Sequence, residues 1–340
     1  NEAWMDRVEE VVDWGLERDL YITLNGHHED WLKVNYRQNN QDRYDAIWRQ
    51  IVERFKDKSD KLLYEIINEP NGLTVAQGDD LIERILGIIR AEEPTRIVIF
   101  GGNMYSNAEQ LFRAAIPGND DQYLVGYYHS YDPWPFAGEH QGTWGTDAHY
   151  RAVTNKFQSV ADWSADKNIP IHLSEYNARV EADFNSRMRW IAHNCDMSVK
   201  FGLAFSIWDD GGWFKVLIRG SNTWPESKDI YIHYYPDSPN EIFSSGAIDA
   251  NDESVTLLEW NNRTPNGDSI IVERSVGNSA DWVPIATLTP TASDFLDTEV
   301  INGNTYFYRL WTKRADGTLL HGYPTKITIR EAGGVQAPFN

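Results

Sequence analysis

The fold of the first two-thirds of this chain follows from one segment, Leu62-Leu63-Tyr64-Glu65-Ile66-Ile67-Asn68-Glu69-Pro70. Its apolar run has the length of a buried strand, and the Asn-Glu-Pro that follows places the carboxylate of Glu69 just past the strand's end. Glu175 follows a second such run, Ile169-Pro170-Ile171-His172-Leu173-Ser174. The two acids are 106 residues apart (175 minus 69), so only the fold can bring them together.

Helical and strand patterns alternate around these two runs. Strands are predicted at residues 21–24, 62–67, 96–100, 123–128, 170–174 and 203–208. Helices are predicted at residues 41–57, 80–91, 147–167 and 181–200, and a stripe of Trp4, Val8, Val11, Val12 and Leu16 predicts another at the N-terminus. Short apolar strands separated by helices indicate an α/β fold with a parallel sheet buried on both faces, and six repeats favour a TIM-type barrel over an open sheet.

The ends of these predicted strands carry the polar residues that matter most. In a TIM-type barrel the catalytic groups sit at the carboxyl ends of the strands. The six ends read His27-His28, Asn68-Glu69, Gly101-Gly102-Asn103, His129-Ser130-Tyr131, Glu175-Tyr176 and Trp208-Asp209. Cleavage of a glycosidic bond needs an acid that protonates the leaving oxygen and a carboxylate at the anomeric carbon. Glu69 and Glu175 can supply these two groups if the barrel brings them together.

Several aromatic residues near these ends have two readings. His28 and Trp31 either contact a substrate or pack in the core, and we leave both readings open. Trp134, Trp144 and Trp213 follow strands and are interpreted as loop anchors rather than as cleft residues. His172 lies inside a predicted strand and is interpreted as a hydrogen-bonded core histidine.

The pattern changes near residue 237, where Tyr235-Pro236-Asp237-Ser238-Pro239 reads as a linker after a barrel domain of residues 1–237. Residues 238–332 form short alternating runs separated by turns, which predict an all-β sandwich of the immunoglobulin-like kind. This part resembles a fibronectin type III module. Trp260 is its candidate core tryptophan and Tyr306 its candidate tyrosine corner, and residues 333–340 are a tail.

Composition narrows the classes of partner. The 340 residues carry a net charge of −20, which argues against nucleic acid and anionic membranes and suits a neutral ligand. No apolar run reaches the roughly 18 residues that span a bilayer. The single cysteine, Cys195, excludes an intrachain disulfide and is interpreted as a structural thiol in a helix. We see no metal-ligand or phosphate-binding motif and expect no metal and no cofactor.

Residues 1 to about 215 resemble glycoside hydrolase family 5, the cellulase-type retaining (β/α)8 enzymes. The matching motifs are Leu24-Asn25-Gly26-His27-His28-Glu29-Asp30-Trp31, Glu65-Ile66-Ile67-Asn68-Glu69-Pro70, Tyr128-His129-Ser130-Tyr131-Asp132-Pro133-Trp134, Leu173-Ser174-Glu175-Tyr176 and Ile207-Trp208-Asp209. The resemblance implies a retaining endo-β-1,4-glucanase that cleaves β-glucan. A β-mannanase or a xyloglucanase of the same family is the alternative.

The resemblance also implies a role for each matched residue. Glu69 would be the acid/base and Glu175 the nucleophile. Asn68 would bind the sugar 2-hydroxyl, His129 would lie near the acid, and Tyr131 would hydrogen-bond the nucleophile. His27, with His28 beside it, would line the subsite on the non-reducing side, and Trp208 would stack under the sugar ring.

The chain departs from the family pattern at its start. Its six strands match strands three to eight of the family, so we expect the first two β/α units and the arginine that ends strand two to be missing. An inactive carbohydrate-binding barrel is therefore a hypothesis of another class. We also expect a homo-oligomer that covers the open sheet edges at residues 21–24 and 203–208. Residues 1–10 contain no signal peptide, and we expect a secreted, bacterial protein.

Overall fold

The structure is a computed structural model that describes residues 1–232, 242–250, 253–263 and 266–329. The predicted linker at Tyr235–Pro239 and the predicted tail at 333–340 lie outside the described residues. The chain divides into two compact units. The first comprises Asn1–Ser130, Gln158–Tyr176 and Leu203–Ser206, and the second comprises Tyr131–Phe157, Asn177–Gly202 and Ile207–Asn340.

The first unit contains a six-stranded sheet whose spatial order follows the chain. Its strands are β1 (Ile22–Asn25), β2 (Leu62–Glu65), β3 (Val98–Gly101), β4 (Leu124–Ser130), β5 (Ile171–Tyr176) and β6 (Ala204–Ile207). Strands β1 to β5 pair in parallel, and β6 follows β5. The sheet is a curled half-barrel consistent with the predicted TIM-type α/β fold. Its strand β2 ends at Glu65, two residues before the predicted end, so Ile66 to Asn68 already belong to the loop.

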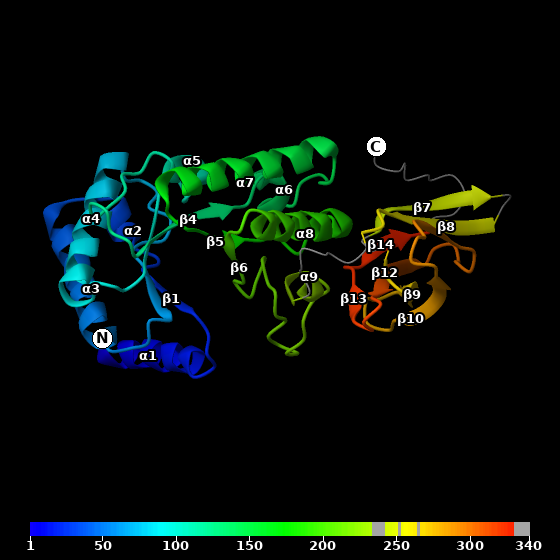
Figure 1. Cartoon of the computed structure of the whole chain (residues 1–340), viewed down its shortest axis with the longest axis horizontal. Helices are drawn as coiled ribbons and strands as arrows, with labels where there is room; N and C mark the ends of the chain where they lie inside the picture. Colours follow the sequence, from blue (N-terminus) through cyan, green and yellow to red (C-terminus); the bar gives the residue numbers. More distant parts are fainter. Residues whose placement is uncertain (233–241, 251–252, 264–265, 330–340) are drawn as a thin grey trace. The chain divides into compact units, whose positions relative to one another are not determined.

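Helices connect the strands, as the alternating pattern predicts (Figure 1). The long helices are α1 (Glu2–Leu16), α3 (Gln38–Phe55), α4 (Val75–Glu92), α7 (Asp147–Lys167) and α8 (Phe184–Lys200). Short helical turns are α2 (Asp30–Lys33), α5 (Ala108–Leu111), α6 (Trp134–Ala137) and α9 (Lys228–Ile232). None of the helices that the structure describes is long and apolar enough to cross a membrane.

All the predicted helices are present, including the one at the N-terminus, although some begin at other residues than predicted. Helix α4 begins five residues before the predicted residue 80, because Thr74 and Gln77 form a capping box that closes its first turn. The predicted stripe on α1 is not a buried face, since Trp4 is 66% and Val11 48% exposed while Val12 is buried. Asn1 precedes α1 without making the side-chain hydrogen bond of an N-cap.

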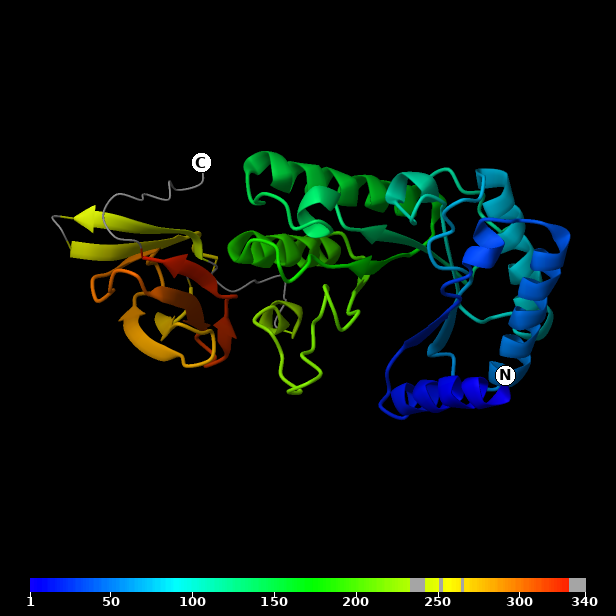
Figure 2. The ribbon, with the colours of Figure 1, turned by 180° about the vertical axis from the view of Figure 1, so that it is seen from behind.

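Helices α3 and α4 run side by side in both views of the ribbon (Figure 2). Side chains alternate between the two faces of a strand, so Tyr64 of β2 points away from the side chain of Glu65. Tyr64 is fully buried, and its ring meets Trp48 of α3 edge-on with centroids 5.7 Å apart. One face of β2 therefore packs against the helix layer, which leaves the other face for Glu65.

The C-terminal part is all-β, as predicted. Its described strands are β7 (Ile242–Ala250), β8 (Glu253–Trp260), β9 (Ser269–Val276), β10 (Val283–Leu288), β11 (Asp294–Asp297), β12 (Thr305–Lys313), β13 (Leu319–His321) and β14 (Thr325–Thr328). They form a sheet of order β10-β9-β12-β13, with β14 also paired to β12, and a sheet of order β11-β8-β7. Trp260 is buried in this core, and the hydroxyl of Tyr306 accepts the Ile301 N–H at 2.8 Å. That bond is of the kind a tyrosine corner makes.

Candidate active site

Glu69 is held in place by a loop rather than by a strand. Its backbone has φ of 42°, in the left-handed region that residues other than glycine rarely adopt. The hydroxyl of Tyr127, from β4, accepts the Glu69 N–H at 3.2 Å and donates to the carbonyl of Ile67 at 2.6 Å. Ser106 donates its hydroxyl proton to the hydroxyl oxygen of Tyr127 at 2.8 Å. One buried phenol thus fixes the turn that presents the carboxylate of Glu69.

Two glycines make room for this arrangement. A Cβ at Gly101 would lie 2.4 Å from the ring of Tyr127, so a larger residue would displace that ring. A Cβ at Gly26 would lie 2.3 Å from the hydroxyl of Tyr44, which donates to the carbonyl of Ile66 at 2.5 Å. Both glycines are needed for close approach of a tyrosine to the chain that follows β2.

Glu175 remains inside its strand. The register between β4 and β5 shifts at this point, because Tyr128 lies opposite Leu173 but His129 lies opposite Glu175. Ser174 is therefore the extra residue of a β-bulge, a device that often re-aims side chains beside active sites. The bulge brings Glu175 directly across from His129.

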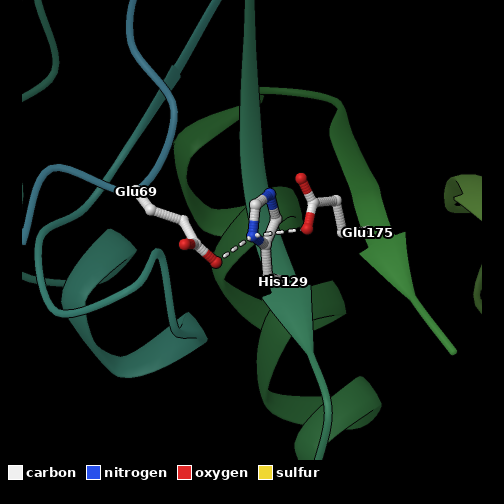
Figure 3. A group of neighbouring side chains, drawn as sticks. All are labelled: Glu69, His129 and Glu175. Atoms are coloured by element: carbon white, nitrogen blue, oxygen red, sulfur yellow. Dashed lines mark hydrogen bonds and ion pairs between the residues drawn. The ribbon is translucent and has the colours of Figure 1, made fainter. Parts of the chain in front are cut away.

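His129 lies between the two carboxylates (Figure 3). Its Nδ1 is 2.9 Å from Oε1 of Glu69 and 3.5 Å from Oε2 of Glu175. Its side chain is 2% exposed, compared with 27% for Glu69 and 14% for Glu175. One ligand atom from each of the three lies within 4.8 Å of the others, so the same group could also surround a cation. The prediction that the fold unites Glu69 and Glu175 is confirmed, and His129 joins them.

A series of hydrogen-bonded polar side chains connects Glu65 to Asn68. Asn25 donates its amide N–H to the carboxyl of Glu65, and its Oδ1 lies 3.1 Å from Nδ1 of His27. Nε2 of His27 lies 3.3 Å from the amide nitrogen of Asn68. Asn25 and Glu65 are opposite residues of the parallel strands β1 and β2. The register of these strands thus builds the first link of the chain.

Burial determines the charge states of Glu65 and His27 in this series of hydrogen-bonded side chains. Burial raises the pKa of Glu65 to about 7; the neighbouring charge on His129 opposes the rise and that on Glu175 adds to it. Burial lowers the pKa of His27 to about 4, assisted by the nearby His28. His27 is therefore neutral at neutral pH, and Glu65 holds its proton to a higher pH than an exposed glutamate does.

The other predicted site residues are placed as follows. His28 meets the ring of His27 edge-on at 4.4 Å between centroids, with its own backbone at φ of 69°. Tyr131 and Trp208 belong to the second unit. The ring of Tyr131 contacts Phe214, and the carbonyl of Trp208 accepts the amide of Asn177 at 2.9 Å. The predicted roles of these residues toward a substrate stay predictions.

Packing supports several interpretations of residues as structural rather than as substrate-binding. Trp31 contacts Tyr44, and the guanidinium of Arg43 lies over its ring, which favours the packing interpretation. His172 is hydrogen-bonded to Ser206 at 2.8 Å, and burial lowers the pKa of its imidazole to about 4. Cys195 lies buried in α8. Among the three loop tryptophans, Trp144 is buried, but Trp134 and Trp213 are at least half exposed, which is more than anchors would be.

Sequence reasoning missed Glu65, Asn25 and Tyr127 as parts of the site. Glu65 and Asn25 each stand within or at the end of an apolar strand, and a polar side chain in such a strand is a detectable signal. Tyr127 gives no such signal, because a tyrosine in a strand is ordinary. The role of its hydroxyl lies in contacts with residues far away in the sequence, among them Ile67 and Glu69, about 60 positions away.

Comparison with known families decides where this chain belongs. Residues 1–211 match the model of Cellulase (glycosyl hydrolase family 5). The chain belongs to glycosyl hydrolase family 5. Endoglucanase H of Acetivibrio thermocellus is 45% identical over 212 residues, which cover 62% of this chain and 23% of that protein. Endoglucanase B of Ruminococcus albus is 26% identical over 263 residues, covering 70% of this chain and 64% of the relative. The chain thus spans less than two-thirds of either relative.

Solved structures of endo-β-1,4-glucanases are also similar to this chain. A hyperthermophilic endo-β-1,4-glucanase in complex with substrate is 31% identical with a TM-score of 0.63, covering 66% of this chain and 76% of that one. A tri-modular family 5 (subfamily 4) endo-β-1,4-glucanase from Bacillus licheniformis, complexed with cellotetraose, is 25% identical with a TM-score of 0.76. That match covers 96% of this chain and 65% of the other.

Proposed function

We propose that this protein is a retaining endo-β-1,4-glucanase in which Glu69 is the acid/base and Glu175 the nucleophile. The observation that carries the proposal is the closeness of the two carboxylates, which offer oxygens within 4.8 Å of one another. Retaining enzymes hold their two carboxyl groups about 5–5.5 Å apart, whereas inverting enzymes leave about 6.5–9.5 Å for a water. The spacing therefore favours a covalent intermediate on one of the two, and the family resemblance assigns it to Glu175.

The reaction follows in two steps. A carboxylate oxygen of Glu175 bonds to the anomeric carbon while the glycosidic bond breaks, and Glu69 gives its proton to the departing sugar oxygen. Glu69, now ionised, then takes a proton from water as that water attacks the anomeric carbon and releases Glu175. His129 contacts both acids and can hold their carboxylates in position through the two steps.

The substrate class is proposed from the relatives and from charge. Two of the similar solved structures are described as endo-β-1,4-glucanases, one with cellotetraose bound. A neutral β-1,4-glucan meets no repulsion from a chain of net charge −20. A β-mannanase is the second candidate, because another similar structure, Cel5A of Thermotoga maritima at TM-score 0.64, is a complex with mannotriose. Xyloglucan is the third polymer to compare.

We also propose that the C-terminal sheets are a fibronectin type III-like module and that the protein acts outside the cell, where a polymeric glucan is found. Burial of Trp260 and the corner bond of Tyr306 support the first proposal. The expected association between copies stays a prediction, which sedimentation over a dilution series would test.

The test is release of reducing ends from carboxymethylcellulose, glucomannan and xyloglucan by the wild type and by Glu69→Gln and Glu175→Gln. We expect release from carboxymethylcellulose and its loss in both variants. Glu109→Gln, at an exposed glutamate of α5, is the matched control and should retain full activity. Proton NMR of the first product should show the β-anomer. Glucan binding with no release by the wild type would instead support an inactive binding barrel, and release by both variants would overturn the assignment.

A further inference from the structure

Hydrogen bonds link Glu65 through Asn25 and His27 to Asn68. The chemistry of the atoms decides which partner donates in each of them. The Oδ1 of Asn25 can only accept, so the Nδ1 of His27 that faces it at 3.1 Å must carry the proton. The amide nitrogen of Asn68 can only donate, so the Nε2 of His27 that faces it at 3.3 Å must be the acceptor. Both contacts independently require the same neutral tautomer of His27.

The orientation of Asn25 depends in turn on Glu65. The amide group of Asn25 would fit its site equally well when turned by 180°, with nitrogen and oxygen exchanged. The ionised carboxyl of Glu65 removes that freedom, because a carboxylate can only accept and therefore holds the amide nitrogen, which turns Oδ1 toward His27. Glu65 is 3% exposed, so water does not compete for this contact.

We propose that Glu65 is a positioning residue that acts through Asn25 and His27 to fix which side of the Asn68 amide faces the substrate. With the Asn68 nitrogen committed to His27, its oxygen is the group left to accept from a sugar hydroxyl. The catalytic consequence rests on the proposed function. The hydrogen-bond relay, by which we mean the contacts from Glu65 through Asn25 and His27 to Asn68, does not depend on that function.

Loss of Glu65 should reverse the relay. With Glu65→Leu the Asn25 amide can turn, His27 can shift its proton to Nε2, and Asn68 must then turn its oxygen toward His27. Misplacement of a substrate-positioning group by about 1 Å can cost about 10²-fold in rate, so we expect kcat on carboxymethylcellulose to fall about 10- to 100-fold. Glu65→Gln keeps an accepting oxygen and should remain within about 3-fold of the wild type.

The experiment combines kinetics with ¹⁵N NMR of the His27 ring, assigned with His27→Gln. At pH 8, above the pKa of about 7 that burial gives Glu65, the wild type and Glu65→Gln should show the Nδ1–H tautomer, and Glu65→Leu should show a shift toward Nε2–H. Tyr64→Phe is the matched control on the opposite face of β2. It should change neither kcat nor the tautomer, whatever it does to stability.

Three results would overturn the relay. The first is an Nε2–H or doubly protonated His27 in the wild type, which needs no variant to fold. The second is an unchanged tautomer in a folded Glu65→Leu protein. The third is a loss of kcat in Glu65→Gln as large as in Glu65→Leu. A wild type that releases no sugar but shows the expected tautomers would refute the proposed glucanase and leave the relay supported.

Discussion

The end of β2 and the end of β5 each present a glutamate to the same histidine, but they hold it by different means. Glu175 is still inside its strand, where pairing with β4 and a bulge at Ser174 aim it. Glu69 has left its strand and stands on a left-handed backbone that the hydroxyl of Tyr127 supports. Two acids of one site can therefore depend on different parts of the fold. Glu175 relies on local strand pairing, and Glu69 relies on a side chain from another strand.

The largest expected effect separates the chemical roles of the two ends. Glu175→Ala should lower turnover by roughly 10⁴-fold or more on every substrate, because no covalent intermediate can form. Glu69→Ala should cost roughly 10²- to 10⁴-fold on carboxymethylcellulose, the range that general acid catalysis provides. On a dinitrophenyl β-cellobioside, whose leaving group needs no proton, Glu69→Ala should still release a burst of phenol in stopped-flow absorbance. A burst from Glu175→Ala instead would exchange the two roles.

The next effect tests the electrostatic coupling between Glu65, at the end of β2, and Glu175, at the end of β5. The pKa of Glu65 rises from 4.5 to about 7 on folding, a difference worth about 3 kcal/mol. The folded state binds this proton more tightly, so the stabilisation is complete below pH 4.5 and is lost as the pH rises through 7. Urea unfolding should therefore show Glu65→Gln gaining on the wild type by up to about 3 kcal/mol between pH 4.5 and pH 8.

Glu175 should modulate that pH dependence. Its negative charge helps to raise the pKa of Glu65, so Glu175→Gln should narrow the pH window over which Glu65→Gln gains stability. Parallel stability curves for the wild type and Glu65→Gln across this pH range would show that Glu65 titrates normally. If Glu175→Gln left this pH range unchanged, the charge of Glu175 would have no effect on the pKa of Glu65.

A smaller effect is expected from Tyr127→Phe. The change leaves the carbonyl of Ile67 and the N–H of Glu69 without their partner, which should lower the free energy of unfolding by about 1–3 kcal/mol. We expect kcat on glucan to fall about 10-fold because the acid loses its support, while the phenol burst set by Glu175 remains. Tyr128→Phe, on the opposite face of β4, is the control and should keep kcat. Equal losses of polymer hydrolysis and burst would mean that Tyr127 supports both ends.

The smallest effect should come from Gly101→Ala. Its new Cβ would lie 2.4 Å from the Tyr127 ring and must push it, so we expect a loss of about 1–3 kcal/mol of stability and a several-fold lower kcat. Gly126→Ala is the matched glycine on β4, where the nearest atom, 2.7 Å away, is the flexible end of Ile171. Stability follows from thermal melts and kcat from sugar release. Equal kcat for the two variants would contradict a special role for the Gly101–Tyr127 contact.

The sequence predicts much of this fold because its signals are local. The alternation of apolar strands and helical stripes locates all six strands of the first unit's sheet, and the two strand-ending acids locate the site. The exposed Trp4 shows the limit of helical periodicity, which cannot say whether a neighbour covers the stripe. The bulge at Ser174 and the relay through Asn25 depend on register between strands, and nearly continuous apolar runs in a sheet buried on both faces do not mark that register.

The hydroxyl of Tyr127 has a consequence for protein design. The Asn-Glu-Pro segment does not carry its own geometry, because its backbone is supported from β4, with Gly101 of β3 leaving space for the supporting ring. Grafting the segment into another α/β scaffold would transfer the acid without its orientation. A designer would have to transplant the loop, the glycine and the tyrosine together, so the smallest portable unit of this acid is three strands wide.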